Sequence, residues 1–252
     1  MSEFTTIQPP KLKGHFMTRQ RMWVLLASLL LVCSFSSCGA LDAVGDAARK
    51  NQAKSNLKNL GMGIHHYCSA HAGNFPTVAV VYKKEKPRLS WRVHVLPYIE
   101  QEALYQKFHL DEAWDSEHNK KLIEEMPPLF AAPTSKVAGE GKTVYLAVTG
   151  KGTAFEKDAK VSLDTIPDGS SSTILLVEAS DEAAVIWTKP DDWQFNPDQP
   201  LDGLVGQYKT GFLVLFADTA AREIPASVDE DLLRRMVLRN DGKPVNLDDL
   251  GP

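Results

Sequence analysis

Residues 41–76 have the sequence LDAVGDAARKNQAKSNLKNLGMGIHHYCSAHAGNFP, and this stretch decides the architecture. It contains no proline before its last residue, and its first half is rich in alanine and long unbranched side chains, which favour helix. Mostly apolar side chains recur at spacings of three and four, the period of one helix face. They are Ala53, Leu57, Leu60, Ile64, Tyr67 and His71. The spacing therefore predicts one long helix over 41–72 that ends near Gly73-Asn74 and buries this face.

Two glycines stand inside this predicted helix, at Gly61 and Gly63. Each weakens a helix by about 1 kcal/mol relative to alanine. We interpret them as points where the helix approaches a sheet closely.

The C-terminal half changes to short β-rich runs separated by turn-forming residues. These runs are Thr143–Thr149, Ser172–Glu178, Ala183–Trp187, Phe212–Ala217 and Ala221–Ile224. A closing helix is predicted over Asp229–Arg239. In the middle of the chain we predict a strand over Thr77–Tyr82 and short helices over Glu100–Phe108 and Asp115–Glu125, whereas Ser90–Leu96 fits a strand or the approach to a helix. A long helix followed by a meander of strands with inserted helices is an α+β pattern.

The bulk composition is that of a globular protein: 252 residues, 43% hydrophobic and 24% charged. The formal net charge of −4 gives no basic field, so we expect no nucleic-acid partner. Three cysteines, Cys33, Cys38 and Cys68, are too few for a disulfide scaffold, and none of their spacings is typical of a zinc site. We expect no metal and no cofactor.

The N-terminal region has the features of an export signal. Residues 23–35, WVLLASLLLVCSF, form an uncharged apolar run that is short for a membrane span and has the length of a signal-peptide core. Arg19 and Arg21 precede it, and FSSCGA at its end resembles a bacterial lipobox, with Phe35 in place of the usual aliphatic residue. The resemblance implies cleavage before Cys38 and lipidation, including palmitate, of that residue. A cleaved soluble export signal and an uncleaved anchor are the alternatives.

These features divide the chain into four segments. We expect an upstream extension and signal peptide over 1–37, a lipid-anchored tether over 38–47, a single domain over 48–240 and a polar tail over 241–252. Residues 1–16 fit no export signal, so Met17 is an alternative start. After cleavage Cys68 would be the remaining thiol, and we interpret it as a core residue.

The mature sequence resembles the bacterial domain of unknown function 1559 family. The similar blocks begin with NLKNLGMGIHHYCSAHAGNFP (Asn56–Pro76) and SWRVHVLPYIEQEALYQKFHLDEAWDSEHNKKL (Ser90–Leu122). They continue with IPDGSSSTILLVEA (Ile166–Ala179) and VLFADTAAREI (Val214–Ile224). The resemblance implies a pilin-like fold, in which a long N-terminal helix packs on an antiparallel sheet, and one of the family's names links it to solute binding.

The chain departs from the family pattern in two places. A lipobox-like signal replaces the prepilin segment that typical members carry, which argues against assembly into a pilus-like fibre. In the late family signature, Tyr208 stands at the position of a histidine and Thr219 at that of a glycine, while Asp218 is kept.

Candidate sites are few in this sequence. Trp187, Trp193 and Phe195 stand close together and either form a ligand-binding surface or pack a loop onto the sheet. Two further groups are candidate metal or cation sites: the histidines His65, His66 and His71, and the carboxylates Glu178, Asp181 and Glu182. The histidine spacing is poor for one metal, and the carboxylates fit a solvated turn or, less well, a cation site.

We expect a non-enzymatic cell-envelope protein, anchored in a membrane by lipid and facing the periplasm or cell surface, that serves as a pilin-like structural or interaction module for an unknown envelope partner. The alternative is an extracytoplasmic solute-binding protein. A hydrolase would need His94, His109 or His118 to meet Glu178.

Overall fold

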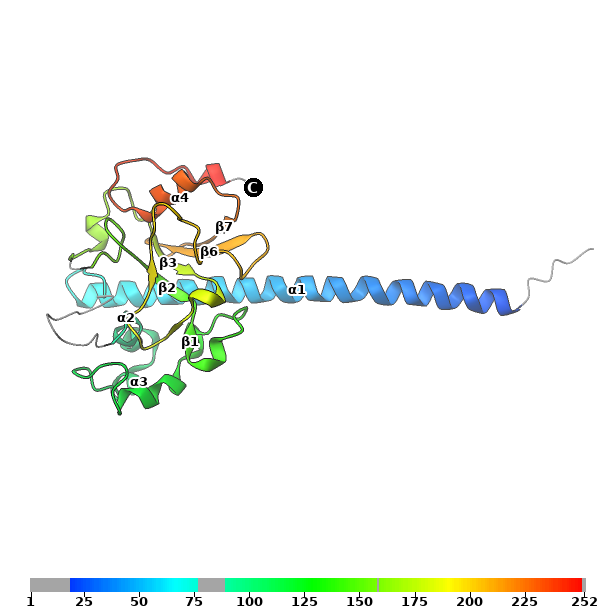
Figure 1. The fold of residues 1–252 in the computed structure, drawn as a ribbon, viewed down its shortest axis with the longest axis horizontal. Coiled ribbons are helices and arrows are strands. Elements are labelled where there is room, and N and C mark those ends of the chain that lie inside the picture. The colour runs from blue at the N-terminus through cyan, green and yellow to red at the C-terminus, as the bar shows by residue number, and fades with distance from the viewer. Residues whose placement is uncertain (1–18, 77–88, 158, 251–252) are drawn as a thin grey trace, which may run out of the picture. The chain divides into compact units, whose positions relative to one another are not determined.

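The computed structural model describes residues 19–76, 89–157 and 159–250, with side chains from residue 44 onwards except at residue 249 (Figure 1). The chain divides into two units, Met1–Ala47 and Ala48–Pro252, of which the second is described below. The predicted strand Thr77–Tyr82 lies outside the described residues, as do the side chains of the signal-like run and of Cys38. No helix within the described part of the chain is both long and apolar enough to cross a membrane.

The first helix, α1, spans Arg19–Ala70 and therefore begins earlier than the predicted 41–72, which excluded the signal-like run. Its predicted apolar face is confirmed over most of its length, because Ala53, Leu57, Leu60 and Ile64 are fully buried. His71, expected on the same face, is instead exposed and stacks on the Tyr67 ring. The helix ends as predicted, with the Gly73 amide donating to the Cys68 carbonyl at 2.8 Å.

A five-stranded sheet has the order β5-β2-β3-β6-β7. Its strands are β2 (Tyr145–Thr149), β3 (Ile174–Glu178), β5 (Trp193–Gln194), β6 (Gly211–Phe216) and β7 (Ala221–Pro225). All neighbouring pairs are antiparallel except β2 and β5. A separate two-stranded sheet pairs β1 (Lys142–Thr143) with β4 (Val185–Ile186). The predicted β-runs thus became strands, whereas β5 was not predicted.

The sheet separates two apolar cores. Along β6, Leu213 and Leu215 belong to the first core and Phe212, Val214 and Phe216 to the second, as the two-residue period of a strand requires. The buried face of α1 fills the first core. The second contains the buried residues of α4 (Glu230–Val237), whose start is capped by Asp229 as predicted (Figure 1).

Short helices fill the chain between α1 and the sheet and between the strands. They are α2 (Trp91–His94), η1 (Leu96–Ile99), α3 (Glu102–Tyr105), η2 (Asn119–Glu125), η3 (Pro128–Phe130), η4 (Ala138–Glu140), η5 (Leu163–Thr165), η6 (Asp181–Ala183) and η7 (Leu247–Leu250). Of the two alternatives for residues 90–96, the approach to a helix is confirmed: the Ser90 hydroxyl accepts from the Arg92 amide and caps α2. The fold class is α+β with a pilin-like arrangement, as predicted.

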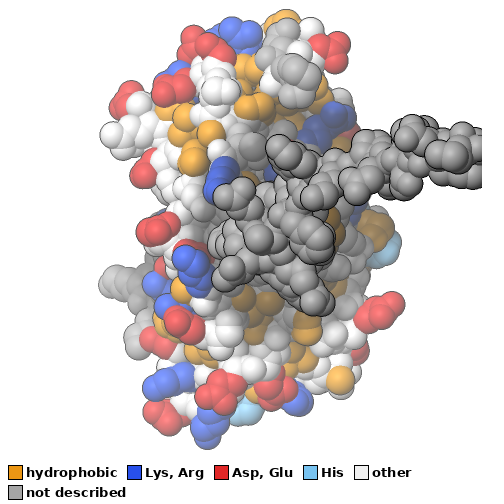
Figure 2. Space-filling model, turned by 90° about the vertical axis from the view of Figure 1, so that its right-hand side faces the viewer, with side chains coloured by type: hydrophobic (Ala, Val, Ile, Leu, Met, Phe, Trp, Pro, Cys, Tyr) orange, Lys and Arg blue, Asp and Glu red, His pale blue; other side chains and the backbone are white. Residues whose placement is uncertain are grey.

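The surface of the molecule carries charges of both signs. On the face shown in Figure 2, acidic and basic side chains are interspersed with apolar ones. The expected absence of a nucleic-acid partner stays a prediction.

Candidate ligand-binding pocket

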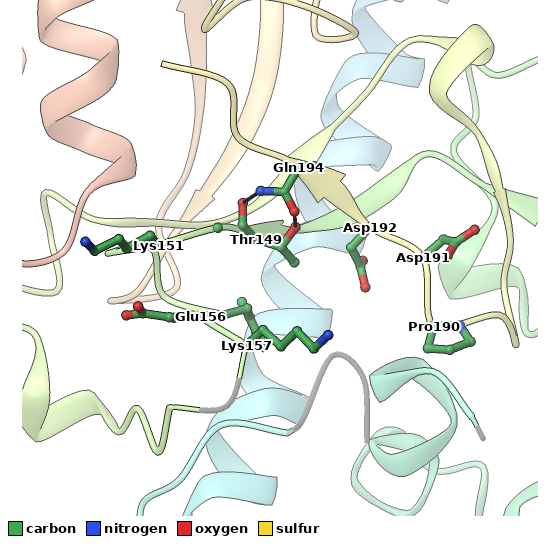
Figure 3. A pocket seen from close by; sticks show the side chains of 10 residues that line it. Thr149, Lys151, Glu156, Lys157, Pro190, Asp191, Asp192 and Gln194 are labelled. Atoms are coloured by element: carbon green, nitrogen blue, oxygen red, sulfur yellow. Dashed lines mark hydrogen bonds between the residues drawn. The ribbon is translucent and has the colours of Figure 1, made fainter. Parts of the chain in front are cut away.

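A pocket with a volume of about 500 Å³ opens at the β5 edge of the five-stranded sheet (Figure 3). Two chain segments line it. Its residues are Thr149, Gly150, Lys151, Phe155, Glu156, Lys157, Pro190, Asp191, Asp192 and Gln194. This volume lies within the range of small-molecule sites, and the lining combines an apolar wall with several charged groups.

Parallel pairing of β2 with β5 brings the two segments together. Thr149 lies opposite Gln194 in the register, and its hydroxyl donates to the Trp193 carbonyl at 2.9 Å. After β2 the chain turns at Gly150, whose φ of 137° favours glycine, and Phe155 returns to form a bridge beside Thr149. The lining residues after β2 and those around β5 therefore face one space.

Asp192 is the most deeply buried polar group of this lining, with a side chain only 2% exposed. Its Oδ1 accepts three hydrogen bonds: from Arg92 Nη2 at 2.6 Å, from the Ala147 amide at 2.8 Å and from Trp91 Nε1 at 3.0 Å. Its Oδ2 is buried and has no hydrogen-bond partner among the residues that the structure describes. A buried polar atom without a hydrogen-bond partner destabilises a protein by about 1–3 kcal/mol, so a group that donates to this oxygen would be stabilising.

Arg92 supports Asp192 from inside the core, where its side chain is fully buried. The guanidinium also donates to the Ser90 hydroxyl, to the Tyr145 carbonyl and to the Asp191 carbonyl. Burial lowers the pKa of Arg92 and raises that of Asp192, while their contact opposes both shifts. We take the pair as ionised, because arginine keeps its proton in proteins and Oδ1 already has three donors.

The other acidic groups of the pocket are also paired with cations. Glu156 accepts from Arg239 at 2.7 Å, and Asp191 lies 2.5 Å from the Lys189 ammonium. Lys151 and Lys157 have no ion pair among the described residues. In Figure 3 the Lys157 side chain extends toward the side of the pocket where the Asp192 carboxylate points, whereas Lys151 points away from it. With all three carboxylates paired to cations outside the lining, Lys151 and Lys157 are the lining charges without a described counter-ion, and Lys157 is the one directed inward (Figure 3).

A family model described as "Protein of unknown function (DUF1559)" matches residues 43–210. The chain belongs to this family. The matched range contains every residue that lines the pocket, together with Arg92. No curated protein and no solved structure matches the DUF1559 chain.

The aromatic residues predicted to form a binding surface are buried in this DUF1559 domain. Trp187 belongs to the first core, stacks near Phe130 and donates to the Ile123 carbonyl at 2.9 Å. Trp193 and Phe195 belong to the second core. The prediction of one shared aromatic surface is corrected accordingly. Trp187 follows β4, whereas Trp193 and Phe195 lie in and after β5, and the two strands belong to different sheets, so the rings are buried in different cores.

The carboxylates predicted as one group, Glu178, Asp181 and Glu182, do not face a common site either. Glu178 is fully buried, and its carboxylate accepts from the hydroxyls of Tyr208, at 3.0 Å, and Thr134, at 3.1 Å. Burial raises the pKa of Glu178 to about 7, although both hydroxyls act against the shift. Asp181 instead accepts from Gln207 and from the Lys136 amide, and Glu182 is exposed. The Tyr208 hydroxyl thus serves a partly buried hydrogen bond.

The histidines take separate places. His65 Nε2 lies 2.8 Å from the Ala217 carbonyl, which ties α1 to the end of β6. His109 and His118 stack with ring centroids 3.5 Å apart and bond to Glu112 and the Lys107 carbonyl, while Glu178 has other partners. Among the described residues, no group of three His, Cys, Asp or Glu side chains is arranged to hold a metal ion.

Sequence reasoning missed the Arg92–Asp192 pair. One signal pointed to it: Arg92 stands between Trp91 and Val93 in an apolar segment, and an arginine in a core requires a buried counter-charge. The position of that counter-charge, 100 residues further along the chain, depends on the tertiary fold.

Proposed function

We propose that this protein is a non-enzymatic envelope protein, held at a membrane by a lipid on Cys38, whose DUF1559 domain binds a small polar solute in the pocket beside Asp192. The observation that carries the proposal is the buried Asp192 Oδ2, which has no partner among the described residues and lies at a pocket of about 500 Å³. A bound solute that donates to this oxygen would remove the desolvation cost. The family's short name, SBP_bac_10, also links it by name to solute-binding proteins.

Binding fits the pocket better than catalysis. Asp192 is held by three donors, one of which is an arginine, and Glu156 and Asp191 are each paired with a cation. A carboxylate stabilised in this way is a weak general base, whereas fixed and paired charges orient a ligand well.

Solute binding is tested on the full-length protein in detergent micelles. Thermal stability is measured with a panel of amino acids, hydroxy acids, neutral sugars and nucleosides. The proposal predicts that at least one class raises the melting temperature in a dose-dependent way, because a ligand of the native state stabilises it by mass action. A panel that produces no shift at millimolar concentrations would contradict the proposal.

A pocket-filling variant identifies the site. Gln194→Trp places a bulky ring at an exposed lining position and is expected to abolish the shift. Gln199→Trp, exposed in the following loop and not part of the lining, is the matched control and should keep it. Loss of binding in both variants would point to a general effect of the added ring.

The lipid anchor is supported by the lipobox-like sequence and by the position of Ala48, where the compact unit begins shortly after Cys38. Labelling with radioactive palmitate tests it. We expect the wild type to be labelled and membrane-bound, and Cys38→Ala to be unlabelled. An unlabelled wild type whose mass still includes residues 23–37 would indicate an uncleaved anchor.

A structural or interaction module is the second candidate function, with an unknown envelope protein as partner. The pilin-like arrangement of α1 on the sheet is the observation that favours it. Chemical crosslinking of the anchored protein in its native membrane separates the two: covalent assemblies that form without any solute would support this role.

A further inference from the structure

We infer that the pocket binds small solutes of the amino-acid or hydroxy-acid class. The amino or hydroxyl group of the solute donates to Asp192 Oδ2, and its acidic group pairs with Lys157. The inference rests on the proposed solute binding and names its ligand class. It follows from three properties of the lining: an acceptor and an inward cation that both lack a partner within the described part of the chain, and an apolar wall.

The first property defines the donor group of the ligand. Asp192 Oδ2 can only accept, since Oδ1 and Arg92 hold the carboxylate in its ionised form. Oδ2 has less than 1 Å² of accessible surface, so a donor must be small and terminal, and the lining must shift slightly to admit it. An ammonium or a hydroxyl meets this condition, and a simple carboxylic acid, which is ionised at neutral pH, does not.

The second property defines the acidic group. Each acidic side chain of the lining already forms an ion pair with a basic side chain: Asp192 with Arg92, Glu156 with Arg239 and Asp191 with Lys189. Lys157 has no ion pair among the described residues and extends toward the Asp192 side of the pocket (Figure 3). An acidic group of the ligand would give this ammonium a charge-assisted hydrogen bond.

The third property concerns the body of the ligand. Phe155 and Pro190 contribute apolar surface to the lining between the charged groups. An uncharged side chain on the ligand can contact this surface, whereas a second charge would lose solvation there. A short apolar amino acid or its hydroxy-acid analogue therefore combines all three properties.

Matched probes test the class by isothermal titration with the full-length protein in detergent micelles. The probes are L-leucine, 2-hydroxy-4-methylpentanoate, leucinamide, 4-methylpentanoate and glucose. Leucine and the hydroxy acid keep both polar groups, leucinamide lacks the acidic group and 4-methylpentanoate lacks the donor. We expect the first two to bind and the two truncated probes to bind at least about tenfold more weakly, as loss of a charged hydrogen bond implies.

Two lysine variants locate the acidic group. Lys157→Gln is expected to weaken leucine binding by about tenfold or more while leaving leucinamide binding unchanged. Lys151→Gln, which removes an equal charge from the same lining but points away from Asp192, should change leucine binding by less than about twofold. Both positions are exposed, so both variants should fold normally.

The outcomes separate the ligand class from the proposed function. Binding of glucose or leucinamide without binding of leucine or its hydroxy acid overturns the inference and leaves solute binding standing. Equal loss of leucine binding in both lysine variants also overturns it, because the effect would then come from the general field of the pocket. If none of the five probes binds, the inference is overturned, and the wider panel described above decides on solute binding.

Discussion

Arg92 and Asp192 form an ion pair with a contact of 2.6 Å inside the fold, and both side chains are almost completely shielded from solvent. The two residues lie 100 positions apart in the sequence. The pair joins the start of α2 to the loop before β5, so it fixes one wall of the pocket against the core.

Removing Asp192 should destabilise the protein strongly. Asp192→Ala leaves the Arg92 guanidinium buried without its counter-charge, which typically costs about 3–5 kcal/mol. Urea unfolding followed by tryptophan fluorescence measures the change in the free energy of unfolding.

The exposed pair of Glu140 and Lys142, with a contact of 2.7 Å, provides the control. Glu140→Ala should change the free energy of unfolding by less than about 1 kcal/mol, because surface pairs contribute little. Similar effects of the two substitutions would mean that the buried pair is not a structural anchor of the fold.

Gly63 should not tolerate a methyl group. A Cβ at this position would lie 2.5 Å from Cγ2 of Ile99 in η1, so one of the two must move. The overpacking cost of about 1–3 kcal/mol should outweigh the gain in helix propensity of about 1 kcal/mol. Gly63→Ala is therefore expected to lower the thermal melting temperature.

Gly139→Ala is the matched control, since no atom lies within 4 Å of its added Cβ. It should leave the melting temperature almost unchanged. A Gly63→Ala protein that is more stable than the wild type would show that α1 and η1 can separate at little cost.

Glu178 should make the stability of the protein depend on pH. Its pKa rises from an ordinary 4.5 to about 7 on folding, so the folded state binds the proton more tightly than the unfolded chain. Its stabilising contribution is complete below pH 4.5 and is lost as the pH rises through about 7, by at most about 3 kcal/mol.

Urea unfolding from pH 5 to pH 8 tests this prediction. The wild type should lose stability over this range relative to Glu178→Gln, whose side chain has the same shape and does not titrate. Glu182→Gln, at an exposed position nearby, should follow the wild type. Parallel pH profiles for the wild type and Glu178→Gln would contradict the assigned pKa.

Cys68 should resist alkylation in the folded protein. Its thiol is 2% exposed, and burial raises its pKa to about 11, so little thiolate is present at neutral pH. Peptide mapping after treatment with iodoacetamide should find Cys68 modified only after denaturation.

Ala70→Cys offers an exposed thiol on the same helix as a control. It should react in the native state under the same conditions. Native modification of Cys68 at a comparable rate would mean that α1 opens from the sheet on the time scale of the reaction.

The sequence allowed much of the fold to be predicted, because the decisive patterns are local. The three- and four-residue spacing of Ala53, Leu57, Leu60 and Ile64 defined the buried face of α1, and Asp229 marked the start of α4. Gly61 does approach the sheet, at Leu215 of β6, whereas Gly63 approaches η1 instead. The spacing indicated a close contact but not which element provides it.

The candidate site was not predictable in the same way. β5 has only two residues, which is too short for any alternation to be recognised. Burial of Trp187 and Trp193 in different cores follows from the separate sheets of β4 and β5, which the spacing of these residues does not reveal. The pocket depends on these non-local pairings, and its key carboxylate stands directly beside β5.

Local stability is expected to differ across the five-stranded sheet, because β5 is a short strand at its edge. β6 lies in the interior of the sheet with all six residues buried, whereas β5, in the part of the chain that the structure describes, pairs with β2 alone and through two residues. Hydrogen–deuterium exchange should therefore be slow at the β6 amides and much faster at those of Gln194 and Phe195. A solute bound in the pocket would stabilise this edge, so we expect it to slow the exchange of Gln194 and Phe195 and to leave the exchange of β6 unchanged.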